Sequence, residues 1–302
     1  MMAMPTAVPK IAFLGTGLMG WPMARRLCDA GHPLNAWNRS PEKAERLRPY
    51  GAAIAATPAG ATANADIVIT MLENGPTVAQ VLFDQGAAAA MRPGTLLVDM
   101  SSIKPAEARD HAGRLAALGL GQIDAPVSGG TNGAEAGTLA IMAGGAAADV
   151  ERVRPVLASM GRVVHVGPTG AGQLAKLANQ MIVGITIGAV AEALLLAARG
   201  GADMARVREA IRGGFAESRV LEVHGQRMVD GDLAKRAAMT VQLKDMRNAL
   251  DAAAGLGFAA PITKLLAELY ADGVHHGLAD LDHSALFVEL ARRSAGADAS
   301  AA

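Results

Sequence analysis

A glycine-rich loop lies near the start of the chain, in the segment KIAFLGTGLMG. The loop reads Gly15-Thr16-Gly17-Leu18-Met19-Gly20, and it follows an apolar run typical of a buried strand and precedes a helical pattern. In that context the first glycine permits a tight turn, the second lets the backbone approach a pyrophosphate, and the third packs the helix against the strand. The free N–H groups and dipole of the helix favour the anion. The loop therefore predicts a dinucleotide site, against the alternative of a turn without a ligand.

The second expected strand ends in Asn38-Arg39-Ser40. Domains that prefer NAD usually carry an acidic residue here, which binds the ribose 2′-hydroxyl. An amide, a cation and a hydroxyl suit a 2′-phosphate instead, because Arg39 can pair with phosphate and stack on adenine. The alternative is a solvated arginine on an exposed loop. We expect these three residues to bind NADP(H), with NAD as the second possibility.

A lysine and two amides share one face of a long helical pattern that follows the glycine-rich segment GPTGAG (167–172). Lys176 lies near the start of this helix, which is an unfavourable place for a cation beside the positive end of the dipole. It is also close to the expected boundary between two domains, where we expect a cleft. Asn179 and Gln180 follow three and four residues later, on the same face. A lysine in a cleft that excludes water can exchange a proton with a developing alkoxide, and the amides can bind a carbonyl or hydroxyl.

The segment Ser128-Gly129-Gly130 follows the end of another expected strand. Its backbone N–H groups and hydroxyl could cradle a carboxylate, as backbone nests do for anions. The alternative is a turn that only reverses the chain. We expect this segment to hold the carboxylate of a small substrate.

Short apolar runs alternate with helical patterns in the first half of the chain, which is typical of a parallel sheet covered on both faces. We therefore predict a doubly wound α/β domain of the Rossmann type over residues 1–168, with helices at Leu18–Gly31 and Pro41–Tyr50. Its strands are expected at Lys10–Gly15, Leu34–Asn38, Ile67–Leu72, Thr95–Met100, Gln122–Pro126, Leu139–Ala143 and Arg162–Val166.

No strand-like run follows Gly172, so the sequence predicts an all-α domain over residues 169–302 that begins with a long interdomain helix. The tail Arg293–Ala302 is rich in Ala and Ser and is expected to fray. The helices are expected at Gln173–Arg199, Met204–Gly213, Ser218–Val229, Thr240–Leu256 and Ala260–Asp272.

The composition excludes several classes of protein. Lys plus Arg (28) balance Asp plus Glu (28), whereas a protein that binds nucleic acid normally carries a basic excess. A hydrophobic content of 51% excludes a mainly disordered chain. One cysteine, Cys28, excludes a disulfide framework and a multi-cysteine zinc site, and the start MMAMPTAVPK has no secretory pattern. We expect a cytoplasmic protein.

The stretch Leu177–Ala198 is long and apolar enough to span a bilayer, and its Gly184-x-x-x-Gly188 spacing is that of membrane helix dimers. Asn179, Gln180 and Glu192 inside the stretch would be costly in hydrocarbon, so we expect a buried helix of a soluble protein and no membrane. This apolar helix, with its glycine stripe, is also expected to bury against a partner subunit, which predicts a homodimer or homotetramer.

The histidines and the cysteine carry weaker signals. His275, His276 and His283 lack the carboxylate–histidine spacing of a zinc site, so surface or packing roles are expected and no metal. Cys28 lies within the first helix and is expected to be a small apolar core residue.

These motifs together resemble the β-hydroxyacid dehydrogenase family over about residues 10–290. Five ordered blocks carry the resemblance: GTGLMGWPMA (15–24), DMSS (99–102), DAPVSGGTNGAEAGTLAIMAGG (124–145), GQLAKLANQ (172–180) and LKDMRNAL (243–250). The resemblance implies an NAD(P)-dependent oxidoreductase that interconverts a small hydroxy acid and its semialdehyde. It makes Lys176 the general acid in reduction and the base in oxidation. Family members place Asn at one or both of positions 179 and 180, so the choice between Asn179 and Gln180 as substrate contact stays open.

The resemblance also assigns residues at strand ends and in the second half. Met71, Leu72 and Ser102 end two expected strands, where ligands of doubly wound sheets bind, and the resemblance makes them cofactor contacts near the nicotinamide. Lys244 is the family's second lysine, which reaches the cofactor, and Asp245 orients a lysine or contacts the substrate. Family members commonly have a Phe that lines the pocket seven residues before this second lysine, and this chain has Ala237 there. The alanine leaves room for a different substrate tail, and the alternative is that the alignment is shifted at this point.

Two cues point to different branches of the family. RGGFAESRVL (212–221) and GLADLDHSAL (277–286) are similar to tartronate semialdehyde reductases, which favours reduction of tartronate semialdehyde to glycerate. Asn38-Arg39-Ser40 is similar to NADPH-using glyoxylate and succinic semialdehyde reductases, and 3-hydroxyisobutyrate dehydrogenase is a further alternative. A non-catalytic dinucleotide-binding scaffold is the alternative of another class. Loss of the catalytic lysine would mark it, and imine reductases also generally replace that lysine, so Lys176 argues against both.

Overall fold

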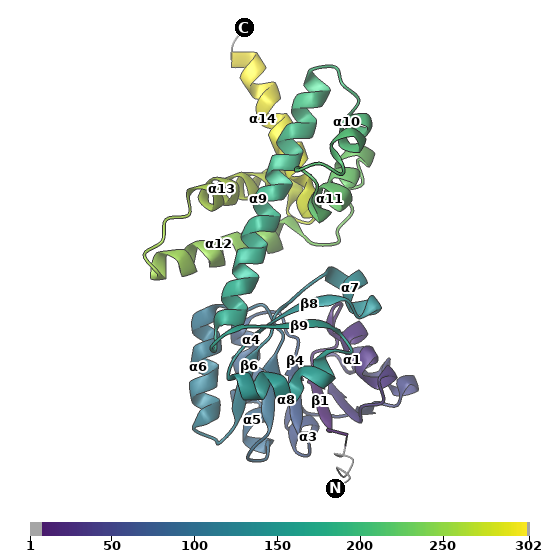
Figure 1. The fold of residues 1–302 in the computed structure, drawn as a ribbon, viewed down its shortest axis with the longest axis vertical. Helices are drawn as coiled ribbons and strands as arrows, with labels where there is room; N and C mark the ends of the chain where they lie inside the picture. Colours follow the sequence, from purple (N-terminus) through teal and green to yellow (C-terminus); the bar gives the residue numbers. More distant parts are fainter. Residues whose placement is uncertain (1–7, 301–302) are drawn as a thin grey trace. The chain divides into compact units, whose positions relative to one another are not determined.

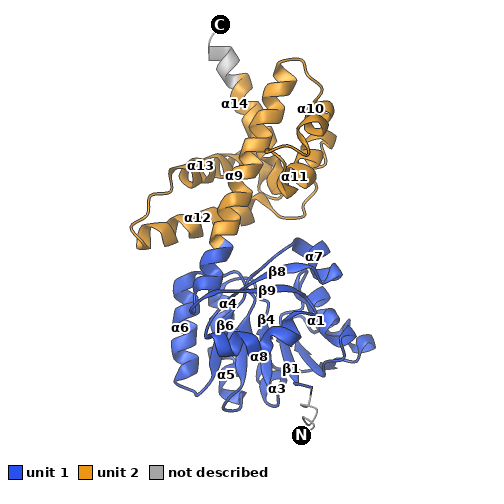
Figure 2. Cartoon of the chain, in the orientation of Figure 1, with its two compact units in different colours: residues 1–176 blue, residues 177–302 orange. Residues whose placement is uncertain are grey.

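The computed structural model describes residues 8–300, without the side chains of 296–300. The chain forms two compact units, residues 1–176 and 177–302 (Figure 2). This division falls inside a long helix, whereas the sequence places the domain boundary just before that helix. Residues 1–7 lie outside the described residues, and they include the N-terminal methionines and the first part of the segment without a secretory pattern. Residues 301 and 302, the last two of the tail, also lie outside them.

The first unit is built on one nine-stranded sheet within the described residues (Figure 1), with the strand order β3-β2-β1-β4-β5-β6-β8-β7 and with β9 paired to β8. The neighbours from β3 through β6 are parallel, which confirms the predicted doubly wound fold. The strands are β1 Ile11–Leu14, β2 Leu34–Trp37, β3 Ala53–Ile54, β4 Ile67–Thr70, β5 Leu96–Asp99, β6 Gly121–Asp124, β7 Val127–Ser128, β8 Leu139–Gly144 and β9 Gly161–Gly167.

One end of the sheet departs from the predicted parallel pattern. Strand β8 runs antiparallel to both β6 and β7 and parallel to β9. A parallel neighbour needs a crossover of about a dozen residues or more, usually through a full helix, and only the short helix α7 (Gly130–Ala136) joins β7 to β8. The chain therefore reverses at the segment that contains Ser128, Gly129 and Gly130.

Both faces of the sheet are buried, because alternate residues of each strand enter two different cores. Ile11 and Phe13 lie in one core, whereas Ala12 and Leu14 lie in the other. The helices that cover the sheet are α1 Gly20–Asp29, α2 Pro41–Glu45, α3 Pro58–Thr62, α4 Gly75–Ala79, α5 Ala87–Ala90, α6 Pro105–Ala116 and α8 Ala147–Leu157. The helix expected at Pro41–Tyr50 breaks into α2 and a 3-10 turn at Arg48–Tyr50, because Pro49 has no N–H to continue an α-helix.

The described part of the second unit is helical, as predicted. Its helices are α9 Ala171–Arg199, which begins in the first unit, α10 Met204–Ile211, α11 Arg219–Asp230, α12 Met239–Gly255, α13 Pro261–Gly273 and α14 Leu286–Ser300. Helix α14 continues into the tail that is expected to fray and ends at Ser300. Glu289 in this helix accepts hydrogen bonds from Arg292 and Arg293, at the i+3 and i+4 spacing that stabilises a helix surface.

Among the described residues one helix, α9, is long and apolar enough to cross a membrane. Core helices of soluble proteins share that length and composition. Ile187, Ala191 and Leu194 of α9 are buried in the core of the second unit.

The glycine stripe of α9, Gly184 and Gly188, is covered by side chains of the same chain. A Cβ on Gly184 would lie 2.5 Å from Nε2 of Gln242, and a Cβ on Gly188 would lie 2.5 Å from Cδ1 of Leu266. Side chains of α12 and α13 of the same chain thus fill the stripe. Glycine at both positions lets these helices approach the backbone of α9 closely.

Candidate active site

The three glycines of the loop between β1 and α1 have different surroundings. Gly15 has a φ of 102°, and a Cβ there would overlap the carbonyl oxygen of Met71 at the end of β4. A Cβ on Gly20 would overlap the carbonyl oxygen of Gly15, whereas a Cβ on Gly17 would meet nothing within 4 Å. The first and third glycines therefore close the turn against the sheet, and the second leaves the backbone open to a ligand.

The loop fits the pyrophosphate that its sequence predicts. Helix α1 begins at Gly20 with no side chain capping it, so its first N–H groups are not capped by the protein's side chains. The hydroxyl of Thr16 is buried and makes no hydrogen bond within the described residues. Uncapped N–H groups and a buried hydroxyl are the donors that an anion takes at a helix start.

Asn38 holds the loop rather than reaching out of it. Its Oδ1 accepts a hydrogen bond from the Thr16 N–H at 2.9 Å, and its Nδ2 donates to the Ser40 carbonyl oxygen at 3.1 Å. Both ends of the amide thus bind backbone. Arg39 between them is exposed, so its guanidinium is accessible to an anionic ligand.

The ends of β4 and β5 are joined by two residues that the sequence reasoning did not single out, Asp99 and Ser101. Oδ1 of Asp99 accepts hydrogen bonds from Thr70 Oγ1 at 2.7 Å and from the Ser101 N–H at 3.0 Å. Ser101 Oγ in turn accepts from the Leu72 N–H at 2.9 Å. Burial raises the pKa of Asp99 above its usual range, opposed by these hydrogen bonds. The DMSS block itself was the available signal, since a buried polar run at a strand end needs partners.

These bonds bring several of the predicted cofactor contacts to one edge of the sheet. Leu72 is tied to Ser101, Gly15 packs against Met71, and Ser102 follows Ser101 directly. This edge is formed by the carboxyl ends of β1, β4 and β5, where doubly wound sheets bind their ligands.

Ser128, Gly129 and Gly130 lie at the other end of the sheet, where β7 stops. Gly129 has a φ of 138° and Gly130 a φ of 63°, so both adopt backbone conformations that favour glycine. Both glycines are exposed and Ser128 is half-buried. The backbone and hydroxyl of this segment are therefore accessible to a small anion.

Four of the predicted residues of the second unit come together. Asn179 Nδ2 donates to Gln180 Oε1 at 2.8 Å, and Gln180 Nε2 donates to Asp245 Oδ2 at 2.6 Å. The other oxygen of Asp245 lies 3.4 Å from Lys244 Nζ. Asp245, at 4% exposure, thus orients both a lysine and an amide. In α9, Lys176 precedes the two amides at the spacing that puts the three on one helix face.

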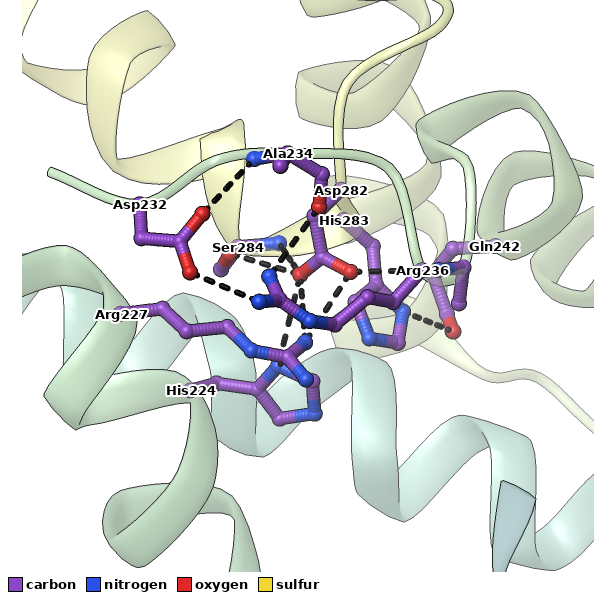
Figure 3. A network of polar contacts seen from close by, with 10 residues as sticks. His224, Arg227, Asp232, Ala234, Arg236, Gln242, Asp282, His283 and Ser284 are labelled. Atoms are coloured by element: carbon purple, nitrogen blue, oxygen red, sulfur yellow. Dashed lines mark hydrogen bonds and ion pairs between the residues drawn. The ribbon is translucent and has the colours of Figure 1, made fainter. Parts of the chain in front are cut away.

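A second polar cluster lies within the second unit (Figure 3) and offers metal-ligating atoms. The ligating atoms of His224, Asp282 and His283 lie within 4.8 Å of one another. Arg227 Nη1, however, donates to both oxygens of Asp282, at 3.1 and 3.0 Å. A guanidinium thus already occupies the carboxylate where a metal ion would bind, so the cluster does not fit a metal.

Two histidines and the cysteine contact other residues of the protein. Burial lowers the pKa of His283 to about 4, and the neighbouring His224 adds to the effect. The Nδ1 atom of His283 lies 3.4 Å from Oε1 of Gln242. The Nδ1 atom of His276 lies 2.9 Å from Oε2 of Glu289. Cys28 packs against the core of the first unit, and burial raises the pKa of its thiol to about 11.

Family models cover most of the chain. The NAD binding domain of 6-phosphogluconate dehydrogenase matches residues 10–167. The NAD-binding domain of NADP-dependent 3-hydroxyisobutyrate dehydrogenase matches residues 170–290. The chain therefore matches NAD(P)-binding dehydrogenase domains in both of its predicted halves.

Individual relatives match nearly end to end. The chain is 43% identical to 2-hydroxy-3-oxopropionate reductase of Escherichia coli (strain K12) over 279 residues, 92% of this chain and 95% of that protein. It resembles the structure of Mycobacterium tuberculosis 3-hydroxyisobutyrate dehydrogenase with L-serine, with a TM-score of 0.87 and 36% identity over 94% of this chain and 99% of that one. Psf3 in complex with NADP+ and 2-OPP has a TM-score of 0.82 and 25% identity over 93% and 99%. The chain belongs to the β-hydroxyacid dehydrogenase family and is an NAD(P)-dependent oxidoreductase of hydroxy acids.

Proposed function

We propose that this enzyme reduces a small acid semialdehyde to the hydroxy acid, with tartronate semialdehyde to glycerate as the first candidate. The observation that carries the proposal is the 43% identity with 2-hydroxy-3-oxopropionate reductase over nearly the full length of both chains. Relatives named 3-hydroxyisobutyrate dehydrogenase are 38% and 37% identical, over similar lengths.

The reaction needs a hydride, which NADPH supplies when it is bound at the glycine loop. The ammonium group of Lys176 donates a proton from Nζ to the oxygen of the carbonyl as it becomes an alkoxide, and in alcohol oxidation the neutral amine takes that proton back. The hydroxyl of Ser128 and the backbone N–H groups of Gly129 and Gly130 hold the substrate carboxylate.

Asn179 is the amide proposed to contact the substrate, at a hydroxyl group. The amide of Gln180 accepts from Asn179 and donates to Asp245, so its groups are engaged within the protein. Asn179 uses only Nδ2 among the described residues, which leaves Oδ1 to accept a hydrogen bond from the substrate hydroxyl. This division of roles assigns Gln180 and Asp245 to orienting Asn179 and Lys244.

NADP(H) is proposed as the preferred cofactor, and NAD(H) as the second possibility. The support is Arg39, an exposed cation at the position where a carboxylate would select NAD, and the NADP+ bound in the similar structure of Psf3. Asn38 contributes by fixing the loop through Thr16, and Ser40 offers a hydroxyl.

The alternative substrates are 3-hydroxyisobutyrate, glyoxylate and succinic semialdehyde, and the alternative of another class is a scaffold that binds NADPH without turnover. The likeness to the Mycobacterium tuberculosis enzyme favours the first of these. Ala237, a small residue where the family commonly has Phe, bears on the length of the substrate tail that the pocket accepts.

The test is oxidation of NADPH, followed by absorbance, with tartronate semialdehyde, glyoxylate, succinic semialdehyde and methylmalonate semialdehyde, and with NADH in parallel. We expect turnover with tartronate semialdehyde and a loss of about 100-fold or more in Lys176→Ala, because a general acid contributes about 100- to 10,000-fold in rate. Lys264→Ala, at an exposed lysine of α13, is the matched control and should be as active as wild type. Tight NADPH binding without turnover of any aldehyde would replace this proposal with the scaffold.

We further propose that the enzyme works in the cytoplasm as a homodimer or homotetramer. The support is the apolar surface that α9 leaves exposed, since only 33% of its most apolar stretch is buried and Ile182 and Leu196 are 66% and 75% exposed. Light scattering of the purified protein measures the mass directly. A mass of 30.8 kDa, that of one chain, would overturn the oligomer.

A further inference from the structure

The first turn of α9 is held by a buried carboxylate at the end of β6. Asp124 is fully buried, and its Oδ1 accepts a hydrogen bond from the Gly170 N–H at 2.7 Å. Its Oδ2 accepts from the Gln173 N–H at 2.8 Å. The first N–H groups of a helix lack partners within the helix, and a carboxylate there is stabilised by the dipole as well.

The side chain of Gln173 continues the connection toward β5. This residue is also fully buried, and its Oε1 accepts from the Ile103 N–H at 3.1 Å. Its Nε2 donates to the Ser101 carbonyl oxygen at 2.8 Å. The two bonded residues flank Ser102 on either side, so one amide fixes the backbone before and after the predicted cofactor contact.

Backbone packing leaves this turn little room to move. A Cβ on Gly172 would overlap the carbonyl oxygens of Asp124 and Met142, which belong to β6 and β8. A Cβ on Gly144 would lie 2.6 Å from the Gly172 nitrogen. The start of α9 therefore sits directly on the backbone of two strands.

We propose that Asp124 and Gln173 are positioning residues that set the place of Lys176 relative to Ser102. Lys176 lies three residues after Gln173 in α9, so the helix turn held by the two side chains is the turn that leads to the lysine. The proposal rests on the proposed function, in which Lys176 donates the proton. A misplacement of about 1 Å costs on the order of 100-fold in rate, so a rigid connection of this kind bears directly on catalysis.

The chain offers a matched control on the same strand. Gln122 lies two residues before Asp124 in β6 and is also buried, but its side-chain oxygen and nitrogen make no hydrogen bond within the described residues. Gln122→Leu thus removes a buried amide without removing a connection, whereas Gln173→Leu removes an amide that makes two.

The experiment measures kcat and KM for tartronate semialdehyde and NADPH in wild type, Gln173→Leu, Asp124→Asn and Gln122→Leu. We expect kcat to fall by about 100-fold in Gln173→Leu with the KM for NADPH little changed, because positioning acts on the proton transfer more than on binding. Asp124→Asn should fall in the same way, and Gln122→Leu should keep the wild-type kcat. Equal kcat values in Gln173→Leu and Gln122→Leu would overturn the proposal. A merely structural role would lower the amount of folded enzyme without changing kcat per folded molecule.

Two readouts separate this proposal from the proposed function and from misfolding. The rate at which acetic anhydride acylates Lys176, quantified by mass spectrometry, should differ between Gln173→Leu and Gln122→Leu. This difference is expected even if wild type turns over no aldehyde. Hydrogen exchange on wild type needs no variant, and the amides of Gly170 and Gln173 should be among the slowest to exchange in the first unit. Exchange of both at the rate of open loops would refute the connection.

Discussion

The loop at residues 15–20 allows a sharp prediction, because its first two glycines should respond differently to the same added methyl group. At Gly15 the φ of 102° is strained for alanine, by about 1–2 kcal/mol. The new Cβ would also overlap the Met71 carbonyl oxygen, and relieving such overpacking costs about 1–3 kcal/mol. Gly15→Ala should therefore lower the free energy of unfolding by about 2–5 kcal/mol.

At Gly17 the methyl group meets no protein atom within 4 Å, so Gly17→Ala should leave the free energy of unfolding nearly unchanged. The methyl would instead stand where the backbone has to approach the pyrophosphate. We expect the Kd for NADPH to rise at least about tenfold, which corresponds to about 1.4 kcal/mol.

The assays are thermal unfolding without cofactor, followed by circular dichroism, and NADPH titration followed by fluorescence. A loss of about 2–5 kcal/mol lowers Tm by roughly 3–8 °C for a chain of this size. Gly15→Ala should show that drop, and Gly17→Ala should unfold at the wild-type Tm. If the Tm of Gly15→Ala equals that of wild type, the close contact with Met71 is refuted. If Gly17→Ala binds NADPH with the wild-type Kd, the loop does not hold the pyrophosphate.

Three further predictions concern other parts of the molecule. Burial alone would raise the pKa of Asp282, but the nearby His224 ring, at 3.6 Å, and the hydrogen bond from the Ser284 hydroxyl hold that pKa below its usual range. The stabilisation from Asp282 is therefore present above about pH 4 and is lost as the pH falls further. Urea unfolding at pH 7 should show Asp282→Ala destabilised by about 3 kcal/mol, because the change leaves the half-buried guanidinium of Arg227 without its carboxylate. The exposed pair of Asp280 with Lys235 is worth about 1 kcal/mol or less, and equal losses at the two sites would contradict this reasoning. Arg39→Ala should raise the KM for NADPH at least about tenfold and leave that for NADH unchanged, since a charge-assisted bond to phosphate contributes about 1.5–3 kcal/mol; parallel changes would remove the argument for NADP. The thiol of Cys28, whose pKa burial raises to about 11, should react with a disulfide reagent at pH 8 only when urea unfolds the chain, and immediate reaction would show that it is not packed.

Local sequence patterns were enough to predict most of the elements. An apolar run followed by GTGLMG identifies strand, turn and helix, because the glycine conformations and the strand burial are properties of a few adjacent residues. One error also has a local cause. The helix expected at Pro41–Tyr50 is interrupted because Pro49 has no N–H to continue it.

The candidate site was predicted residue by residue, but its connections were not. The choice between Asn179 and Gln180 was open in the sequence, and the bond from Gln180 to Asp245 joins residues 65 positions apart. Likewise, nothing in the glycine stripe of α9 shows whether a membrane, a second chain or the same chain covers it. Packing against Gln242 and Leu266 decided that question.

The sequence by itself determined that this protein has a Rossmann-type domain followed by a helical one, and which residue types could bind a dinucleotide and move a proton. Those properties depend on spacing along the chain, which periodicity and turn chemistry express directly. Only the tertiary structure decided that Asp124 and Gln173 hold the start of α9, the helix that carries Lys176. It also decided that Arg227 binds the carboxylate of the one cluster of metal-ligating side chains found among the described residues. These contacts join distant segments, and a buried polar group takes whichever partner the packed elements bring within hydrogen-bond reach.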